Sequence, residues 1–386
     1  MGGRRRIRSQ ANPPELVATL IAVSYTWDEI EQDWLGALAN LALSNEVVVA
    51  AFNGVERTFG RDWMETTRTL SGGRSTGVGP VLGVVSTGQW LESLHGIEDT
   101  GRLLEGLRSH DRAARTEAIA IHLLRSNDPR LEVELEPTVE VAGRDRVPDF
   151  RARKDGSAWT YVEVSAAELS EEGKAVMAAL HNLARVIEEA SVPILALEFF
   201  LRRTPTDEEQ EELIALGVAT AGRSGRLEEE LPHELGKIRL NLDEPGKFTA
   251  DLPRGEQSGP RLGALHRKLG PEVDRHVAVR IAFSDDRAAE FLRREAKHLP
   301  TDSPGLIVLF TDRGGWSEWG TAIGARLHPG QHTRVSGVCL VRSGLSLTEN
   351  GEAWVPETRL IENKNAPHEL PEWISEALSA FPSETA

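Results

Sequence analysis

The chain is poor in cysteine and has no long apolar run. Cys339 is the only cysteine among 386 residues, which excludes an internal disulfide framework and a cysteine-rich zinc site. We expect a buried thiol in a reducing compartment, and therefore a cytoplasmic location. No segment approaches the ~20 apolar residues that a transmembrane helix needs, so no membrane partner is expected.

Positive charge is also scarce. Lysine and arginine total 44 against 60 aspartates and glutamates, and the formal net charge is -16. This balance argues against tight, sequence-independent binding of long nucleic acid, because such binding needs a coat of positive charge. Any nucleic acid would have to meet a local basic patch. The lysines are Lys154, Lys174, Lys237, Lys247, Lys268, Lys297 and Lys364.

The remaining composition is that of a soluble globular protein. With 40% hydrophobic and 27% charged residues, the chain can bury one large core or two modest ones. Residues 1–105 are predicted to be a mixed α/β N-terminal region, in which a helix over 27–43 precedes a buried strand over 46–52. Residues 106–205 are predicted to form a central domain, and 206–386 an α/β region packed on it.

Hydrophobic periodicity is clearest in the central region. It predicts a helix, three strands, a helix and a strand, over residues 111–126, 131–141, 147–153, 158–165, 170–190 and 192–201. Beyond it, strands near 277–283, 305–311 and 335–342 are predicted to alternate with helices near 285–298 and 316–327. The fold class is therefore α/β.

Two carboxylates fall on neighbouring strands of this region, where together they could hold a divalent cation. Asp149 lies near the start of one strand and Glu163 near the end of the next. If Asp155 and Gly156 form a two-residue type I′ turn, Glu163 points to the opposite face from Asp149. If Lys154 to Gly156 form a three-residue loop, the two acids share a face as diagonal neighbours. We prefer the second alternative, because it has glycine at the position that needs a left-handed backbone.

A third acid lies on an apolar helix stripe. Glu117 is spaced helically with Ala114, Ile121 and Leu124, where an unpaired charge would be costly to bury. A metal site or an arginine could be its partner. An ordinary salt bridge to Arg151 or Arg153 remains an equal alternative.

These elements resemble the core of the PD-(D/E)XK, or restriction-endonuclease-like, nuclease superfamily. The resemblance covers residues 111–190 and implies metal-dependent hydrolysis of phosphodiesters with Mg2+ or Mn2+. By motif, Asp149 and Glu163 match the metal-binding acids, Val164 the residue whose carbonyl assists, and Glu117 the helical acid. The position of the motif lysine holds Ser165.

The serine raises the question of which cation replaces the lysine. The resemblance implies that a lysine on the following helix can serve, which makes Lys174 a candidate, although a solvated lysine is an equal interpretation. Arg151 could stabilise phosphate charge but could not act as a general base. Arg293 and Arg294 are either a phosphate patch or a solvated helix face. His328 and His332 have metal-like spacing, but Pro329 and Gly330 favour loop histidines.

The function expected from the sequence is a metal-dependent nuclease acting on nucleic acid. One alternative is an inactive descendant of the same fold that binds nucleic acid or protein. Another is a bacterial scaffold or partner-binding protein. Self-association and a protein partner are left open.

Overall fold

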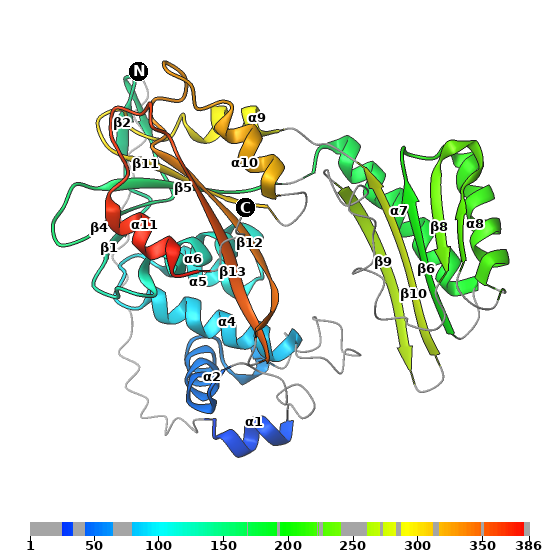
Figure 1. Ribbon diagram of the computed structural model, residues 1–386. Coiled ribbons are helices and arrows are strands. Elements are labelled where there is room, and N and C mark those ends of the chain that lie inside the picture. Colours follow the sequence, from blue (N-terminus) through cyan, green and yellow to red (C-terminus); the bar gives the residue numbers. More distant parts are fainter. Residues whose placement is uncertain are drawn as a thin grey trace, which may run out of the picture. The chain divides into compact units, whose positions relative to one another are not determined.

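The computed structural model describes most of the chain between residues 25 and 381 (Figure 1). The described residues are 25–33, 43–64, 79–167, 169–190, 194–221, 223, 227–240, 261–270, 273–282, 287–311, 316–348 and 351–381. The chain divides into two compact units, Met1–Gly88 and Gln89–Ala386, and each is described by itself.

In the first unit the secondary structure of the described residues is helical. Helix α1 covers Trp27–Asp33 and α2 covers Asn45–Phe59, whereas α4, Gly79–Leu94, continues into the second unit. The predicted strand over 46–52 is therefore wrong. Ser44 caps α2 by accepting a hydrogen bond from the N–H of Val47. The buried residues of α2 follow helical and not strand spacing: Val48, Ala51, Phe52 and Val55.

A six-stranded sheet forms the centre of the second unit. Its order is β1-β4-β5-β11-β12-β13, with β5, β11 and β12 parallel to one another and the other pairs antiparallel. The strands are β1 (Glu132–Leu135), β4 (Phe150–Arg153), β5 (Thr160–Ala166), β11 (Gly305–Phe310), β12 (Gly337–Thr348) and β13 (Gly351–Glu362). Strand β11 is buried along its whole length, as expected for a central parallel strand. A separate hairpin pairs β2 (Val139–Val141) with β3 (Arg144–Arg146).

Helices pack on this sheet. Helix α5 (Gly101–Arg108) contacts α6 (Arg112–Arg125), which contacts β5 and also α11 (Glu372–Ser379). Helix α9 (Ala288–Glu295) contacts β5 and α10 (Trp316–Gly324). Apolar residues of α9 share one buried cluster with Tyr161 of β5 and Ile307 and Leu309 of β11. The β5 face that carries Tyr161 is therefore the face that α9 covers.

A five-stranded sheet is built from the residues between β5 and α9, with order β7-β8-β6-β10-β9. Helices α7 and α8 pack against it (Figure 1). A buried cluster rich in leucine, valine and isoleucine joins the helices to the sheet. Its elements are α7 (Glu171–Ala190), β6 (Ile194–Leu201), α8 (Asp207–Ala221), β7 (Leu227–Glu230), the short 3-10 helix η1 (Pro232–Glu234), β8 (Gly236–Leu240), β9 (Arg261–Gly270) and β10 (Val273–Ala282).

The expected core differs from the observed one in its last helix and strand. Strand β6 forms where the sequence predicted it, but it pairs with β8 and β10 in the five-stranded sheet. The parallel neighbour of β5 is instead β11, which follows α9. Sequence periodicity locates a strand but does not select its partner, and consecutive strands are neighbours only about two-thirds of the time. The mixed α/β class is confirmed. In the part of the chain described, no helix has the length and apolarity needed to cross a membrane.

Candidate functional site

The turn between β4 and β5 decides where Glu163 points. Asp155 and Gly156 both have a left-handed backbone, with φ of 50° and 72°, and the N–H of Ser157 donates to the carbonyl of Lys154 at 2.9 Å. This is the pattern of a two-residue type I′ turn, so the preferred three-residue loop is wrong. The ladder, however, pairs Ala152 with Thr160. Between this pair and the turn, the β5 side has three residues, 157–159, and the β4 side has two, 153 and 154, so the β5 side has a bulge of one residue.

This one-residue bulge reverses the consequence of the turn. A type I′ turn alone would put Asp149 and Glu163 on opposite faces, but the extra residue shifts the register by one. Because Phe150 pairs with Val162, the next position along the ladder sets Asp149 against Glu163. The carboxylate Oδ2 of Asp149 accepts a hydrogen bond of 2.7 Å from the N–H of Val164. The expectation that the two acids lie together is confirmed, through a register that neither sequence alternative contained.

Val164 contributes its N–H to this arrangement. The family resemblance implied that its carbonyl assists at a metal site, and that role stays a prediction. The contact that the structure shows is the donor bond to Asp149. The residue after Glu163 therefore positions the first acid.

Glu117 lies close to these acids and has its own partner. Its side chain is only 5% exposed, and both carboxylate oxygens accept from Nη2 of Arg102 in α5, at 2.9 and 2.7 Å. Arg102 also pairs with Glu136 at 2.8 Å. The salt bridge that the sequence offered as an alternative thus exists, but to Arg102 and not to Arg151 or Arg153.

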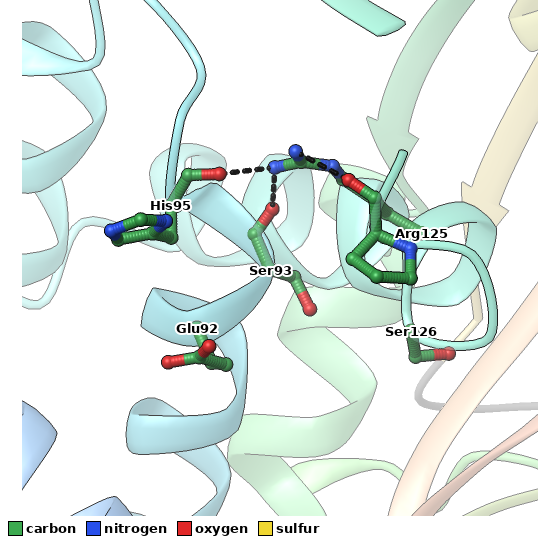
Figure 2. A pocket seen from close by; sticks show the side chains of 6 residues that line it. Glu92, Ser93, His95, Arg125 and Ser126 are labelled. Atoms are coloured by element: carbon green, nitrogen blue, oxygen red, sulfur yellow. Dashed lines mark hydrogen bonds between the residues drawn. The ribbon is translucent and has the colours of Figure 1, made fainter. Parts of the chain in front are cut away.

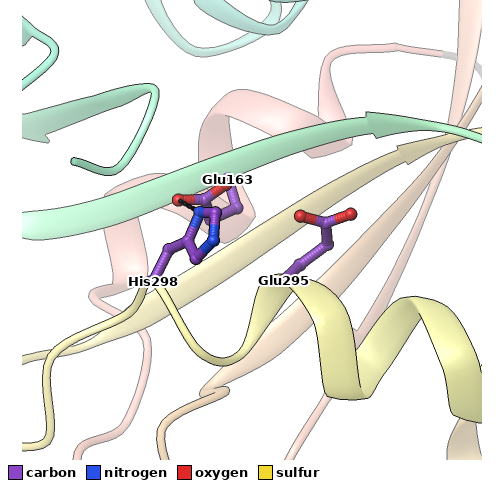
Figure 3. Close-up of side chains that lie close together, drawn as sticks. All are labelled: Glu163, Glu295 and His298. Carbon is purple, nitrogen blue, oxygen red and sulfur yellow. Dashed lines mark ion pairs between the residues drawn. The ribbon is translucent and has the colours of Figure 1, made fainter. Parts of the chain in front are cut away.

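Two further ligand-type side chains come from α9 and the turn after it. Glu163, Glu295 and His298 present ligand atoms that all lie within 4.8 Å of one another (Figure 3). Glu163 projects from β5, Glu295 from the end of α9 and His298 from the following turn. The Glu163 and Glu295 side chains are 4% and 8% exposed. These three residues are called the EEH cluster below.

Glu163 lacks a hydrogen-bond partner for one buried oxygen. Oε1 lies 3.2 Å from Nδ1 of His298, but the contact lacks hydrogen-bond geometry, and no other partner exists among the described residues. Leaving a carboxylate oxygen buried and unpaired is costly. A bound cation would give this oxygen a partner, and two carboxylates with an imidazole are a donor set that fits a divalent metal.

The electrostatics of the acids point the same way. The pKa of Glu163 is raised to about 9, first by burial and then by the charges of Asp149, Glu295 and Glu117. Burial raises the pKa of Asp149, although the Val164 N–H opposes the shift. Burial raises the pKa of Glu117 to about 7 despite the hydrogen bonds from Arg102. Several carboxylates thus lie close together with little positive charge to offset their mutual repulsion, and a bound cation would reduce that repulsion.

Arg294 reaches the same face of β5. Its Nη2 donates to Oγ of Ser165 at 2.6 Å, and its Nε contacts Oε1 of Glu295 at 2.6 Å. The arginine side chain is 47% exposed. Ser165, which occupies the position of the motif lysine, therefore contacts a guanidinium from α9.

The other candidate cations have different partners. Arg151 binds Glu134 of β1 at 2.5 Å, donates to the hydroxyl of Tyr161 at 3.2 Å and stacks on Trp159. Lys174 pairs with Glu171 at 2.8 Å on the exposed first turn of α7. The partners of Arg151 thus hold it near strand β1. Lys174 is a lysine on the helix surface, which agrees with the interpretation of it as a solvated lysine.

Sequence reasoning missed Glu295 and His298. One usable signal was present, because Glu295 falls at helical spacing with Ala288, Phe291 and Leu292, all of which are buried. The same criterion, a carboxylate on an apolar stripe, had singled out Glu117. His298 follows the helix in an irregular turn, so no periodicity marks it.

A pocket elsewhere in the second unit is structural in character. Glu92, Ser93, His95, Arg125, Ser126 and Pro129 line it (Figure 2). The Arg125 guanidinium donates to the carbonyls of Ser93, His95 and Pro129 at 2.6 to 2.8 Å, which ties the end of α4 to the turn after α6. These three hydrogen bonds of Arg125 hold the backbone of two segments together, which is a structural role.

Two smaller expectations were also resolved. Cys339 is fully buried in β12, and burial raises the pKa of its thiol to about 12, so it is an inert core residue. His328 and His332 lie in the turns after α10, as expected for loop histidines.

Comparison of the chain with protein-family models, curated proteins and solved structures gave no match.

Proposed function

We propose that this protein is a divalent-metal-dependent phosphodiester hydrolase, a nuclease of the PD-(D/E)XK type with a rearranged site. The main support for this proposal is the EEH cluster, in which one buried oxygen of Glu163, beside Asp149, has no hydrogen-bond partner in the described part of the chain. The order of elements gives further support. Helix α6, strands β1, β4 and β5, then α9 and β11 follow the order helix, three strands, helix and strand, with the β2–β3 hairpin and residues 167–287 interposed.

Each residue has a role that its position allows. Glu163, Glu295 and His298 would hold the cation, with Asp149 as the adjoining carboxylate. A cation at this site would polarise a phosphoryl oxygen and make water a better nucleophile at neutral pH. Glu117, held by Arg102, adds negative potential that favours cation binding. In the reaction, the oxygen of water forms a bond to phosphorus and the P–O ester bond breaks. The leaving alkoxide takes up a proton, and the products are a phosphomonoester and an alcohol.

The decisive experiment combines metal binding with cleavage. Calorimetry would measure Mn2+ and Mg2+ binding to the wild type, to Asp149→Ala and to Glu163→Gln. Labelled single- and double-stranded DNA and RNA would then be incubated with each metal. We expect metal-dependent cleavage that both substitutions abolish. Glu132→Gln is the matched control, because Glu132 is a half-exposed acid paired with Arg153 at the β1 edge.

The outcomes separate the alternatives. If the wild type binds no metal and cleaves no substrate, the hydrolase proposal is wrong, and an inactive binding module becomes the better interpretation. If Glu132→Gln is as damaging as Glu163→Gln, the cleavage does not arise from the EEH cluster.

A further inference from the structure

Arg294 is a half-exposed arginine that is held in place next to the EEH cluster. Its guanidinium is anchored by two hydrogen bonds, from Nη2 to Ser165 and from Nε to Glu295, and nearly half of its side chain remains exposed. A guanidinium has five N–H donors, and these two contacts leave donors for an external ligand. One of its anchors, Glu295, belongs to the EEH cluster, so the guanidinium lies directly beside the candidate metal site.

The anchoring fixes where the charge lies. Ser165 is two residues beyond Glu163 on β5, so both side chains lie on the face of the strand that α9 covers. The aromatic ring of Phe291 supports the guanidinium from one side, with 4.7 Å between Cζ and the ring centroid. Holding the arginine in place before a ligand arrives lowers the entropic cost of binding. A solvated helix-face arginine would have none of these constraints.

From this arrangement we propose that Arg294 binds the phosphate group of the substrate beside the metal site and neutralises its charge during hydrolysis. The inference rests on the proposed function and adds to the metal ligands a residue that binds the substrate phosphate. Arginine suits this role because its planar fork matches phosphate oxygens. Arg294 cannot take the proton from water, since a guanidinium stays protonated in proteins. It acts on the non-bridging oxygens, where charge is spread during phosphoryl transfer.

The neighbouring Arg293 supplies a matched control. It lies on the same helix, is also exposed and has the same charge, but the contacts to Ser165 and Glu295 belong to Arg294. A general effect of positive charge on α9 would respond equally to either substitution. A specific phosphate site would respond to Arg294 alone.

The first measurement is the binding of inorganic phosphate to the Mn2+-loaded protein by calorimetry. We expect Arg294→Ala to weaken phosphate binding about 10-fold or more, as for loss of one charge-assisted contact. Mn2+ binding should be retained or slightly tighter, because a positive charge beside the site has been removed. Arg293→Ala should match the wild type in both measurements.

The second measurement is Mn2+-dependent hydrolysis of bis(4-nitrophenyl) phosphate, a small diester that needs no extended binding surface. We expect Arg294→Ala to lower kcat/KM about 100-fold, as for removal of one transition-state donor, with Arg294→Lys intermediate. The double variant Ser165→Lys with Arg294→Ala should recover at least part of that loss. The lysine introduced at position 165 would project from β5 at the residue that the Arg294 guanidinium contacts in the wild type.

The two proposals fail in different ways. A wild type that binds no Mn2+ contradicts the hydrolase itself. If Mn2+ binds and the diester is hydrolysed, but Arg294→Ala and Arg293→Ala have equal phosphate affinity and equal kcat/KM, the hydrolase stands and the role of Arg294 is wrong. If Mn2+ binds without hydrolysis, the phosphate titration still decides the inference about Arg294.

Discussion

The carboxylate of Asp149 is joined to the backbone N–H of Val164 by a hydrogen bond of 2.7 Å. This bond fastens the residue before β4 to the residue after Glu163, so the two acids are held together by backbone as well as by register. Asparagine keeps an acceptor for this N–H but carries no charge, whereas alanine keeps neither.

Substitutions at Asp149 should therefore separate folding from metal binding. Asp149→Ala should lower the free energy of unfolding by about 1–3 kcal/mol, because a hydrogen bond from backbone to a half-buried carboxylate is lost. Asp149→Asn should be closer to the wild type in stability and still bind Mn2+ more weakly. Urea unfolding and calorimetry measure the two effects. Equal stability losses in both variants would show that the charge, not the hydrogen bond, supports the fold.

Glu163 should stabilise the metal-loaded protein and destabilise the metal-free one. A carboxyl whose folded pKa is raised above 4.5 to about 9 contributes full stability below pH 4.5 and loses it progressively as pH rises through 9. Near pH 8 without metal, Glu163→Gln should therefore raise Tm by at least about 2 °C. The same variant should lose the increase in Tm that Mn2+ gives the wild type.

Glu188 provides the contrast to that prediction. It is also a buried acid, but it pairs with Arg275 at 3.3 Å in the part of the chain that forms the five-stranded sheet. Removing one member of a buried ion pair leaves the other charge uncompensated, so Glu188→Gln should lower Tm. Thermal unfolding in a chelating buffer tests both variants. A fall in Tm for both would contradict the assignment of Glu163 to a metal.

His298 should determine which metal is preferred. Imidazole nitrogen is a poor partner for Mg2+, which favours oxygen ligands, but it is readily accepted by Mn2+ and other transition metals. We expect the wild type to bind Mn2+ at least about 10-fold more tightly than Mg2+, and His298→Ala to lose most of that difference. Calorimetric titrations with both metals provide the measurement. His328→Ala, in an exposed turn, should keep the preference, and if it does not, the selectivity arises elsewhere.

The pair formed by Arg102 and Glu117 should show strong coupling. Arg102→Gln leaves Glu117 buried without its partner and should destabilise the fold by about 1–2 kcal/mol, less than for a fully buried pair because Arg102 is half exposed. The double variant with Glu117→Gln should recover most of the loss. A double-mutant cycle by urea unfolding measures this coupling, and strictly additive effects would contradict it.

His122 should make the protein sensitive to acid. Its Nδ1 lies 2.8 Å from Oγ of Ser93, and burial lowers its pKa to about 4. A histidine with a depressed pKa contributes stability above its unfolded value of about 6.5 that is lost as pH falls toward 4. We expect a loss on the order of 3 kcal/mol over that interval, which His122→Gln should largely remove. Exposed His328→Gln should leave the acid transition unchanged.

The sequence located most elements but not the complete site. Period and composition identified α6, β4, β5 and β11, and a carboxylate on an apolar stripe identified Glu117. The relation of Asp149 to Glu163 depended on a bulge of one residue, and nothing in local sequence specifies a bulge between two otherwise regular strands. Glu295, His298 and Arg294 could not be joined to Glu163 in advance, because β11 and not β6 pairs with β5. Long-range pairing, which local propensity does not encode, completes the site.

That pairing also governs when in folding the site can exist. Strands β5 and β11 are neighbours, yet residues 167–304 separate them along the chain. The entropic cost of closing so long a loop rises only with the logarithm of its length, and much of the intervening segment has its own buried core. We expect that core to form early and the closure of β5 on β11 to come late. Glu163 lies before the interval and Glu295 and His298 near its end. An incompletely folded chain would therefore hold the ligands apart and could neither capture a metal nor hydrolyse a diester.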